Sequence, residues 1–278
     1  MTLKDSLRIK QKIKKQFSIA AEDYDSKAFF QKKIAEELLE YLVPQLAACS
    51  LQLATILDIG CGTGFLTIPL KKTFSSARIF ACDIAHPMIR SLQFKIQNSK
   101  FKIVFTTADC ESLPYRERQF DLIVSNLTYQ WLLYPEKALS EVYRVLKPGG
   151  IFSLSTLGYD TLKELRECYE DASIILNKDG LPPFMTFSKA HDIISKLKES
   201  GFKDISFAED IKFEEYHGML NLLKTLKSIG AGNPFDSSEK SLGAAAILKK
   251  MSEIYRQRFG TKNKIYATHE MLFFTAKK

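Results

Sequence analysis

A glycine-rich turn that begins with an acidic residue is the part of this sequence best suited to bind a ligand. Ile56–Phe65 reads ILDIGCGTGF, so an apolar run leads through Asp58 into alternating glycines. Glycines let the backbone turn sharply and approach a ligand closely. A dinucleotide-binding fingerprint would have its third glycine where Phe65 stands. Since a carboxylate repels pyrophosphate and attracts a cation, Asp58 favours a ligand with a positively charged amino acid part.

Two further acids stand at the ends of the next two apolar runs. Asp83, followed by Ile84, can accept hydrogen bonds from both hydroxyls of a ribose; its alternative role is the N-cap of a helix beginning near Pro87. Asp109 can accept a hydrogen bond from an adenine amino group while the Cys110 backbone serves a ring nitrogen; its alternative role is that of a turn residue. A cationic amino acid, a ribose and an adenine together indicate S-adenosylmethionine (SAM).

The end of a fourth apolar run completes the predicted cofactor site. Asn126 lies there, at the place where the reactive methyl group of SAM is expected. This segment is not an NPPY-type motif, which would suit methylation of amino groups in bases or glutamine. The predicted cofactor-binding residues are Asp58, Gly60, Cys61, Gly62, Gly64, Asp83, Ile84, Asp109, Cys110 and Asn126.

Strands and helices alternate through the middle of the chain and would position these residues. Buried strands are expected at 53–59, 77–82, 102–107, 120–125 and 151–156, with helices at 66–74, 87–97 and 135–146. This alternation predicts an α/β fold with a doubly wound parallel sheet. Such sheets bind ligands at the carboxyl ends of their strands, which is where the three acids stand.

The flanking segments predict covers for that edge of the sheet. Helices are expected at 6–22, 27–48, 160–178, 187–200, 217–229 and 239–259, and strands at 202–213 and 266–275. We therefore predict four parts: N-terminal helices covering the site (1–48), a SAM-binding α/β core (49–157), a helical cap with one core strand near 202–213 (158–262), and a terminal core strand (263–278).

Composition and charge argue against several other classes of protein. The chain has 278 residues, of which 45% are hydrophobic, so a buried core is expected and disorder is not. Its apolar runs are too short for a membrane span, and its N-terminus does not resemble a secretory signal. The five cysteines are scattered and form no CxxC pair, which argues against disulfides and a zinc site and favours the cytoplasm.

Residues 50–156 resemble the class I SAM-dependent methyltransferases in their glycine loop and in the acids that end successive strands. The resemblance implies a Rossmann-like, seven-stranded sheet that finishes with an antiparallel hairpin and carries a helical cap insertion. It also implies SAM as the methyl donor, S-adenosylhomocysteine as the product, and no metal.

A narrower resemblance, to the malonyl-[acyl-carrier protein] O-methyltransferases (BioC) of biotin synthesis, extends over nearly the whole chain. The matching segments, in that family's order, are KQFSIAAEDYD, SNLTYQWL, STLGYDTLKEL, LKTLKSIGAGN and YRQRFGTKNKIYATHEMLF. The family's reaction is methyl esterification of the free carboxylate of a malonyl thioester. A carboxylate is already ionised at neutral pH and needs no general base, which agrees with the lack of any histidine cluster.

The same resemblance implies the acceptor site. Tyr24, Thr156 and Lys227 would bind the malonyl carboxylate, and Gln130 and Trp131 would line the substrate pocket. Members of the family carry arginine at the position of Lys227. This chain therefore offers a single ammonium charge in place of a guanidinium that can donate two parallel hydrogen bonds to a carboxylate. Each residue also has an alternative role. Tyr24 could pack in a half-buried position, Thr156 could simply end a strand, and Lys227 could be a solvated lysine on a helix.

The resemblance also implies a partner, because the acceptor would arrive on the phosphopantetheine arm of an acidic acyl carrier protein. The net charge of +8 and the lysine-rich N-terminal helix would steer that partner. Two alternatives stay open: a methyltransferase for another small, aconitate-like carboxylic acid, and a SAM-binding assembly factor of respiratory complexes. Nucleic acid is not expected as a partner, since the sequence has no catalytic Cys-Pro pair or RNA-binding module. A membrane is not expected either, since no apolar run is long enough to span one.

Overall fold

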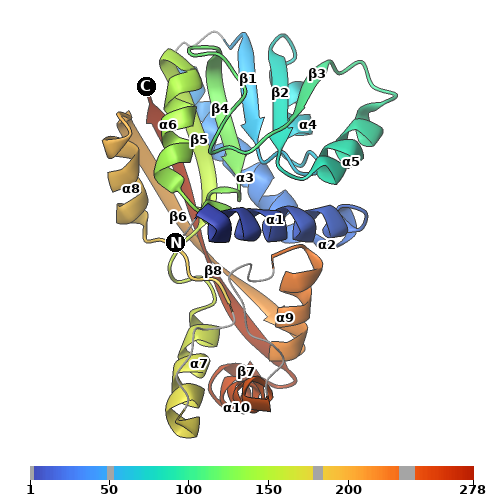
Figure 1. Ribbon diagram of the computed structural model, residues 1–278, viewed down its shortest axis with the longest axis vertical. Helices are drawn as coiled ribbons and strands as arrows, with labels where there is room; N and C mark the ends of the chain where they lie inside the picture. Colours follow the sequence, from blue (N-terminus) through green and yellow to red (C-terminus); the bar gives the residue numbers. More distant parts are fainter. Residues whose placement is uncertain (1–2, 49–52, 178–183, 232–241) are drawn as a thin grey trace.

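A single mixed sheet forms the centre of the molecule (Figure 1). The structure, a computed structural model, describes residues 3–48, 53–177, 184–231 and 242–278. The strand order is β3-β2-β1-β4-β5-β8-β6, and the two-residue strand β7 (Gly260–Thr261) pairs with β8. The main strands are β1 (Thr55–Ile59), β2 (Arg78–Asp83), β3 (Ile103–Thr107), β4 (Phe120–Asn126), β5 (Leu146–Leu157), β6 (Lys203–Tyr216) and β8 (Lys264–Lys277).

The first five strands are parallel, and β8 runs antiparallel to both of its neighbours, β5 and β6. The residues of β1, β2 and β4 are mostly buried and apolar, as expected for strands covered on both faces. In this register Asp58 lies opposite Ala81 on β2 and Val124 on β4, while Asp83 lies opposite Thr107 on β3. The acids therefore gather near one edge of the sheet.

Helices cover both faces of the sheet. On one face lie α3 (Phe29–Ala48), α4 (Thr67–Thr73) and α5 (His86–Ile96), which bury Leu38, Leu70 and Leu92 among others. On the other lie α6 (Pro135–Val145) and α8 (Ala190–Glu199), whose Leu139 and Ile193 join a second core. The class of fold predicted from the sequence, a doubly wound α/β sheet of the class I methyltransferase type, is confirmed.

The N-terminal helix crosses the carboxyl edge of the sheet. In Figure 1, α1 (Leu3–Ala20) runs beneath the ends of β1 and β4, and the short helix α2 (Tyr24–Lys27) follows it. Ile13 and Ala20 of α1 are buried, although most of its other side chains are partly or fully exposed. This helix therefore forms a wall over the place where the three acids stand.

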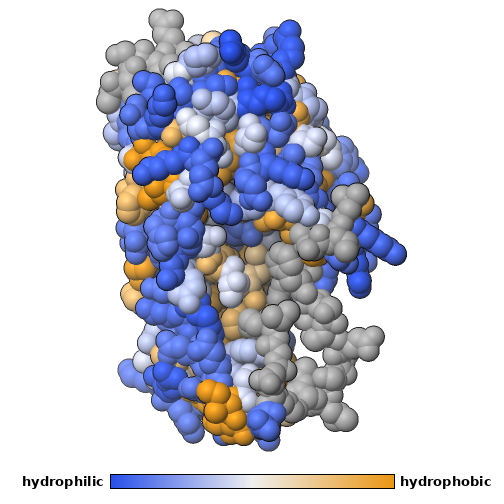
Figure 2. Space-filling view, turned by 60° about the vertical axis from the view of Figure 1, so that its left-hand side comes forward, coloured by the Kyte–Doolittle hydropathy of each residue, from blue (hydrophilic) through white to orange (hydrophobic). Residues whose placement is uncertain are grey.

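The far end of the molecule is a smaller helical layer. Strands β6 and β8 continue beyond the other strands and carry α7 (Lys163–Leu176), α9 (Met219–Ser228) and α10 (Leu242–Phe259) (Figure 1). A separate core that includes Leu165, Leu222 and Tyr255 holds this layer together. Figure 2 shows hydrophobic side chains in a recess between this layer and the sheet, bordered by hydrophilic surface.

Two details differ from the sequence-based expectation. Strand β5 begins at Leu146, before the Pro148-Gly149-Gly150 turn, because Leu146 pairs with Phe120 ahead of a register shift. Helix α8 was expected in the cap, but it packs against α6 and β6 in the layer on the sheet. Of the helix expected at 239–259, the structure describes Leu242–Phe259, and residues 239–241 lie outside the described ones. Within the described residues, no helix is long and apolar enough to cross a bilayer.

Candidate active site

A cavity of about 550 Å³ lies at the carboxyl edge of the sheet, under α1 and against the smaller helical layer of α7, α9 and α10, called the cap below. Its wall combines the glycine loop after β1, the ends of β2, β4 and β5, helix α1 and one side of α9. Of the predicted site residues, those on the wall are Tyr24, Asp58, Gly60, Cys61, Gly62, Asp83, Ile84, Asp109, Cys110, Asn126, Gln130, Trp131 and Lys227. Gly64 and Thr156 do not line it.

Two glycines of the loop stand where a side chain would collide with a neighbouring residue. Gly60 has φ +69°, and a Cβ there would stand 2.0 Å from the Thr128 hydroxyl oxygen. The Gly60 amide donates to the carbonyl of Cys82, which fixes the loop onto β2. A Cβ on Gly64 would meet Leu92 of α5, so that glycine permits close packing between the loop and the helix.

Asp58 is a buried carboxylate with an unused oxygen. It is only 1% exposed, and its Oδ2 accepts a hydrogen bond of 2.5 Å from the Thr67 hydroxyl. Its Oδ1 has no hydrogen-bond partner among the described residues, although Asp58 lines the cavity. Burial raises the pKa of Asp58 to about 7. An orphaned carboxylate oxygen at the cavity wall fits a cationic ligand, such as the ammonium group of SAM.

Asp83 is held by backbone amides in a position that leaves it facing the cavity. Its Oδ2 accepts from the Gly62 amide at 2.9 Å, and its Oδ1 accepts from the Ala85 amide at 2.8 Å. Burial raises the pKa of Asp83 to about 6, although the hydrogen bonds from these amides act to lower it. Helix α5 starts at His86 with Ala85 as its N-cap and has no side-chain cap, so Asp83 is not the cap of this helix.

Asp109 forms an ion pair with a lysine of the N-terminal helix α1. Lys10 of α1 forms ion pairs with Asp109 at 2.5 Å and with Glu111 at 2.6 Å. Glu111 in turn accepts hydrogen bonds from the amides of Leu133 and Tyr134, beyond the end of β4. The predicted adenine-binding segment is therefore tied directly to α1, a contact that reasoning from the motifs missed.

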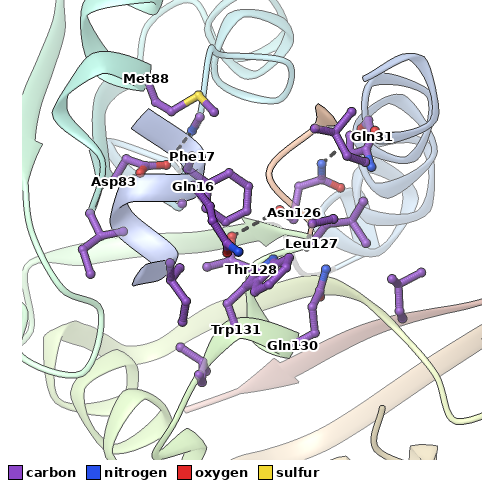
Figure 3. A pocket seen from close by; sticks show the side chains of 18 of the residues that line it. Gln16, Phe17, Gln31, Asp83, Met88, Asn126, Leu127, Thr128, Gln130 and Trp131 are labelled. Atoms are coloured by element: carbon purple, nitrogen blue, oxygen red, sulfur yellow. Dashed lines mark hydrogen bonds between the residues drawn. The ribbon is translucent and has the colours of Figure 1, made fainter. Parts of the chain in front are cut away.

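The end of β4 forms the floor of the cavity (Figure 3). The Asn126 amide donates to the Gln31 carbonyl at 3.2 Å and accepts from the Ser155 hydroxyl at 2.7 Å, so its orientation is fixed. Thr156 is 1% exposed and donates to Gln130 Oε1 at 3.0 Å. Thr156 thus reaches the cavity only through Gln130, which does line it.

Helix α1 also supplies wall residues that the sequence reasoning did not select. The ring of Phe17 packs edge-on against Trp131 with centroids 5.2 Å apart, and Figure 3 shows Gln16 and Phe17 pointing from α1 toward Trp131. Gln16 Oε1 is buried without a hydrogen-bond partner in the described part of the chain. The helical spacing of Ile13, Gln16 and Phe17 is the signal that could have identified this face.

Tyr24 and Lys227 reach the cavity from neighbouring helices, since α2 and α9 are in contact. The ring of Tyr24 stacks on Phe65, and burial together with nearby Asp83 raises the pKa of Tyr24, which keeps its hydroxyl protonated. Asp25, the next residue, ties α2 to the glycine loop by accepting from the Thr63 hydroxyl at 2.6 Å. Lys227 is exposed, and the structure gives it no ion-pair partner among the described residues.

Comparison with known proteins now identifies the class. Residues 57–154 match the family described as "Methyltransferase domain". The structure resembles that of a putative methyltransferase from Bacillus halodurans with a TM-score of 0.59 at 16% identity, covering 88% of this chain and 98% of that one. The fold and this match make the chain a SAM-dependent methyltransferase with the class I fold, and SAM is its cofactor.

Similarity over the full length identifies the family. The chain is 31% identical over 269 residues to a malonyl-[acyl-carrier protein] O-methyltransferase of Geobacter sulfurreducens, covering 97% of this chain and 99% of that protein. It is also 31% identical to the protein of the same name from Brevibacillus brevis, with 96% of each chain covered. The chain therefore belongs to the malonyl-[acyl-carrier protein] O-methyltransferase family, as its sequence motifs predicted.

Proposed function

We propose that this enzyme transfers the methyl group of SAM to the free carboxylate of a malonyl group held as a thioester on an acyl carrier protein, an early step of biotin synthesis. The observation that carries the proposal is the similarity to enzymes of that name over 97% of the chain, cap included. Bound SAM supplies an electrophilic methyl group. The protein's own task is to hold the carboxylate in line with it and to exclude water.

The cofactor half of the cavity would use the three acids. Asp58 would pair with the ammonium group through its unused oxygen. Asp83 would accept the ribose hydroxyls with the lone pairs not engaged by Gly62 and Ala85. Asp109 would accept the adenine amino group, supported by the Cys110 backbone, with Lys10 balancing its charge.

The acceptor half would use a cation and hydroxyl donors. Lys227 supplies a positive charge at the cavity wall, where an incoming carboxylate needs one. The protonated hydroxyl of Tyr24 can donate to the same group. Thr156 would act as a positioning residue, since its hydrogen bond orients Gln130. No group on this wall has to remove a proton, because a carboxylate is the nucleophile.

The partner would be an acidic acyl carrier protein approaching the side of α1. Lys14 and Lys15 are exposed on α1, the helix that also walls the cavity, and the chain carries a net charge of +8. Such charge raises the rate of encounter with an acidic protein and makes it sensitive to salt. We place the reaction in the cytoplasm, in keeping with the free thiols of Cys61, Cys82, Cys110 and Cys168.

Replacing Lys227 tests the acceptor site. Lys227→Ala should raise the KM for malonyl carrier protein by about tenfold or more, because a charge-assisted contact contributes about 1.5–3 kcal/mol, and should leave SAM affinity unchanged. Lys224→Ala is the matched control: it removes another exposed lysine of α9 that does not line the cavity. Equal KM values for the two variants would refute the role of Lys227.

A further inference from the structure

His269 is a buried histidine in the cavity wall whose ring makes no hydrogen bond to the described residues. It lies on β8, is 4% exposed and lines the cavity. Neither of its ring nitrogens has a hydrogen-bond partner in the part of the chain that the structure describes. Buried polar groups in folded proteins nearly always have a partner, so an imidazole with two unused nitrogens at a cavity wall points to a ligand.

The groups around His269 leave its imidazole neutral. Its ring packs on that of Phe30, with centroids 4.8 Å apart. The nearest acidic oxygen, Glu214 Oε2, is 3.7 Å from Nε2 and already accepts a hydrogen bond from Tyr216. Thr268 is bound to Glu164, on the opposite side of the strand. Burial lowers the pKa of His269 despite these two glutamates, so the ring offers one N–H donor.

The order of the strands places His269 in the acceptor half of the cavity. The three acids that would hold SAM stand at or just beyond the carboxyl ends of β1, β2 and β3, on one side of β4. Strands β5 and β8 lie on the other side of β4, where Asn126 marks the expected site of the methyl group. His269 shares its wall with Leu157, the last residue of β5, and with Leu162 beyond it. A ligand reaching His269 must therefore extend beyond the methyl group, away from the cofactor.

We propose that His269 is a substrate-binding residue whose N–H donates a hydrogen bond to the thioester carbonyl oxygen of the acceptor. The assignment rests on the function proposed above. A neutral donor suits a neutral carbonyl, whereas the carboxylate of the same acyl group requires the charge of Lys227. The two residues would hold the two ends of a short acyl chain, and selectivity for malonyl over longer or shorter diacids would follow from their spacing.

His269→Phe tests this assignment because it keeps a flat ring against Phe30 and removes both nitrogens. The KM for malonyl carrier protein should rise by about 5- to 100-fold, the range expected for one lost hydrogen bond in a buried site. SAM affinity should not change, and the melting temperature should not fall, since no hydrogen bond within the protein is lost. His269→Asn, which keeps an N–H donor, should recover part of the loss. His191→Phe, a change of an exposed histidine on α8, is the control.

A substrate analogue separates a lost contact from a merely structural effect. Replacing the thioester carbonyl by a methylene group, to give a thioether, should reduce turnover by wild-type enzyme by about the same factor as His269→Phe. In the variant, the analogue should cause no further loss. An unchanged KM in His269→Phe, or an equal loss with the analogue in both proteins, would overturn the assignment while leaving the proposed function intact. Wild-type enzyme that forms no methyl ester on malonyl carrier protein would overturn both.

Discussion

The raised pKa of Asp58 predicts that SAM binds more tightly as the pH rises. The buried carboxyl has a pKa of about 7 in the free protein, and only its ionised form attracts the ammonium group. About a tenth of Asp58 is then ionised near pH 6 and about three quarters near pH 7.5, so SAM affinity should rise about eightfold between the two. Asp83, with a pKa of about 6, would add a smaller increase in the same direction.

Asp58→Asn isolates this effect. The Thr67 hydroxyl can still donate to the amide oxygen, so the loop should keep its place. At about pH 7.5 the variant should bind SAM roughly 10- to 100-fold more weakly, because an ion-assisted hydrogen bond contributes about 1.5–3 kcal/mol. Most of the pH dependence should disappear. Calorimetric titration at both pH values, in two buffers of different ionisation enthalpy, measures affinity and proton release together. A flat wild-type profile, or a variant with the wild-type slope, would refute the reasoning.

Two further predictions concern the free protein. Since folding raises the pKa of Asp58 and Asp83, their contribution to stability is largest below the ordinary carboxyl pKa and is lost as the pH rises through about 7. The melting temperature without SAM should therefore include a decrease from about pH 5 to about pH 8 that is absent in the Asp58→Asn, Asp83→Asn double variant; an unchanged slope would contradict this. Gly60→Ala should destabilise far more than Gly62→Ala: both glycines have positive φ, but only at Gly60 does a Cβ collide, with Thr128. Thr128→Ala should restore part of the loss, and equal melting temperatures for the two glycine variants would refute the clash.

The sequence predicted the parallel part of the sheet well because its signals are local. Each strand from β1 to β4 is a short apolar run that stops at a polar or glycine residue, and the parallel arrangement then brings Asp58, Asp83 and Asp109 to the same edge. The residue pattern also predicted β6 and β8, and the resemblance to class I methyltransferases implied their antiparallel pairing. The resemblance also directed attention to Lys227 and Tyr24, which do reach the cavity from adjoining helices.

Contacts between distant segments could not be predicted in this way. The ion pairs of Lys10 with Asp109 and Glu111 join residues about a hundred positions apart, and nothing in either segment indicates the other. The unused nitrogens of His269 are visible only once every neighbour is placed. Thr156 shows the converse: it lies at the expected strand end, but its hydroxyl is bound to Gln130 and Thr156 itself does not line the cavity.

Mass measurement of the carrier protein after reaction with SAM tests the proposed activity most directly. Malonyl carrier protein should gain one methyl group, and mild alkaline hydrolysis should remove it, as expected of an ester. Acetyl carrier protein, which has no free carboxylate, should gain nothing, and free malonate should react far more slowly than the carrier-bound form. Absence of the methyl ester from malonyl carrier protein, in a preparation shown by calorimetry to bind SAM, would contradict the proposed function.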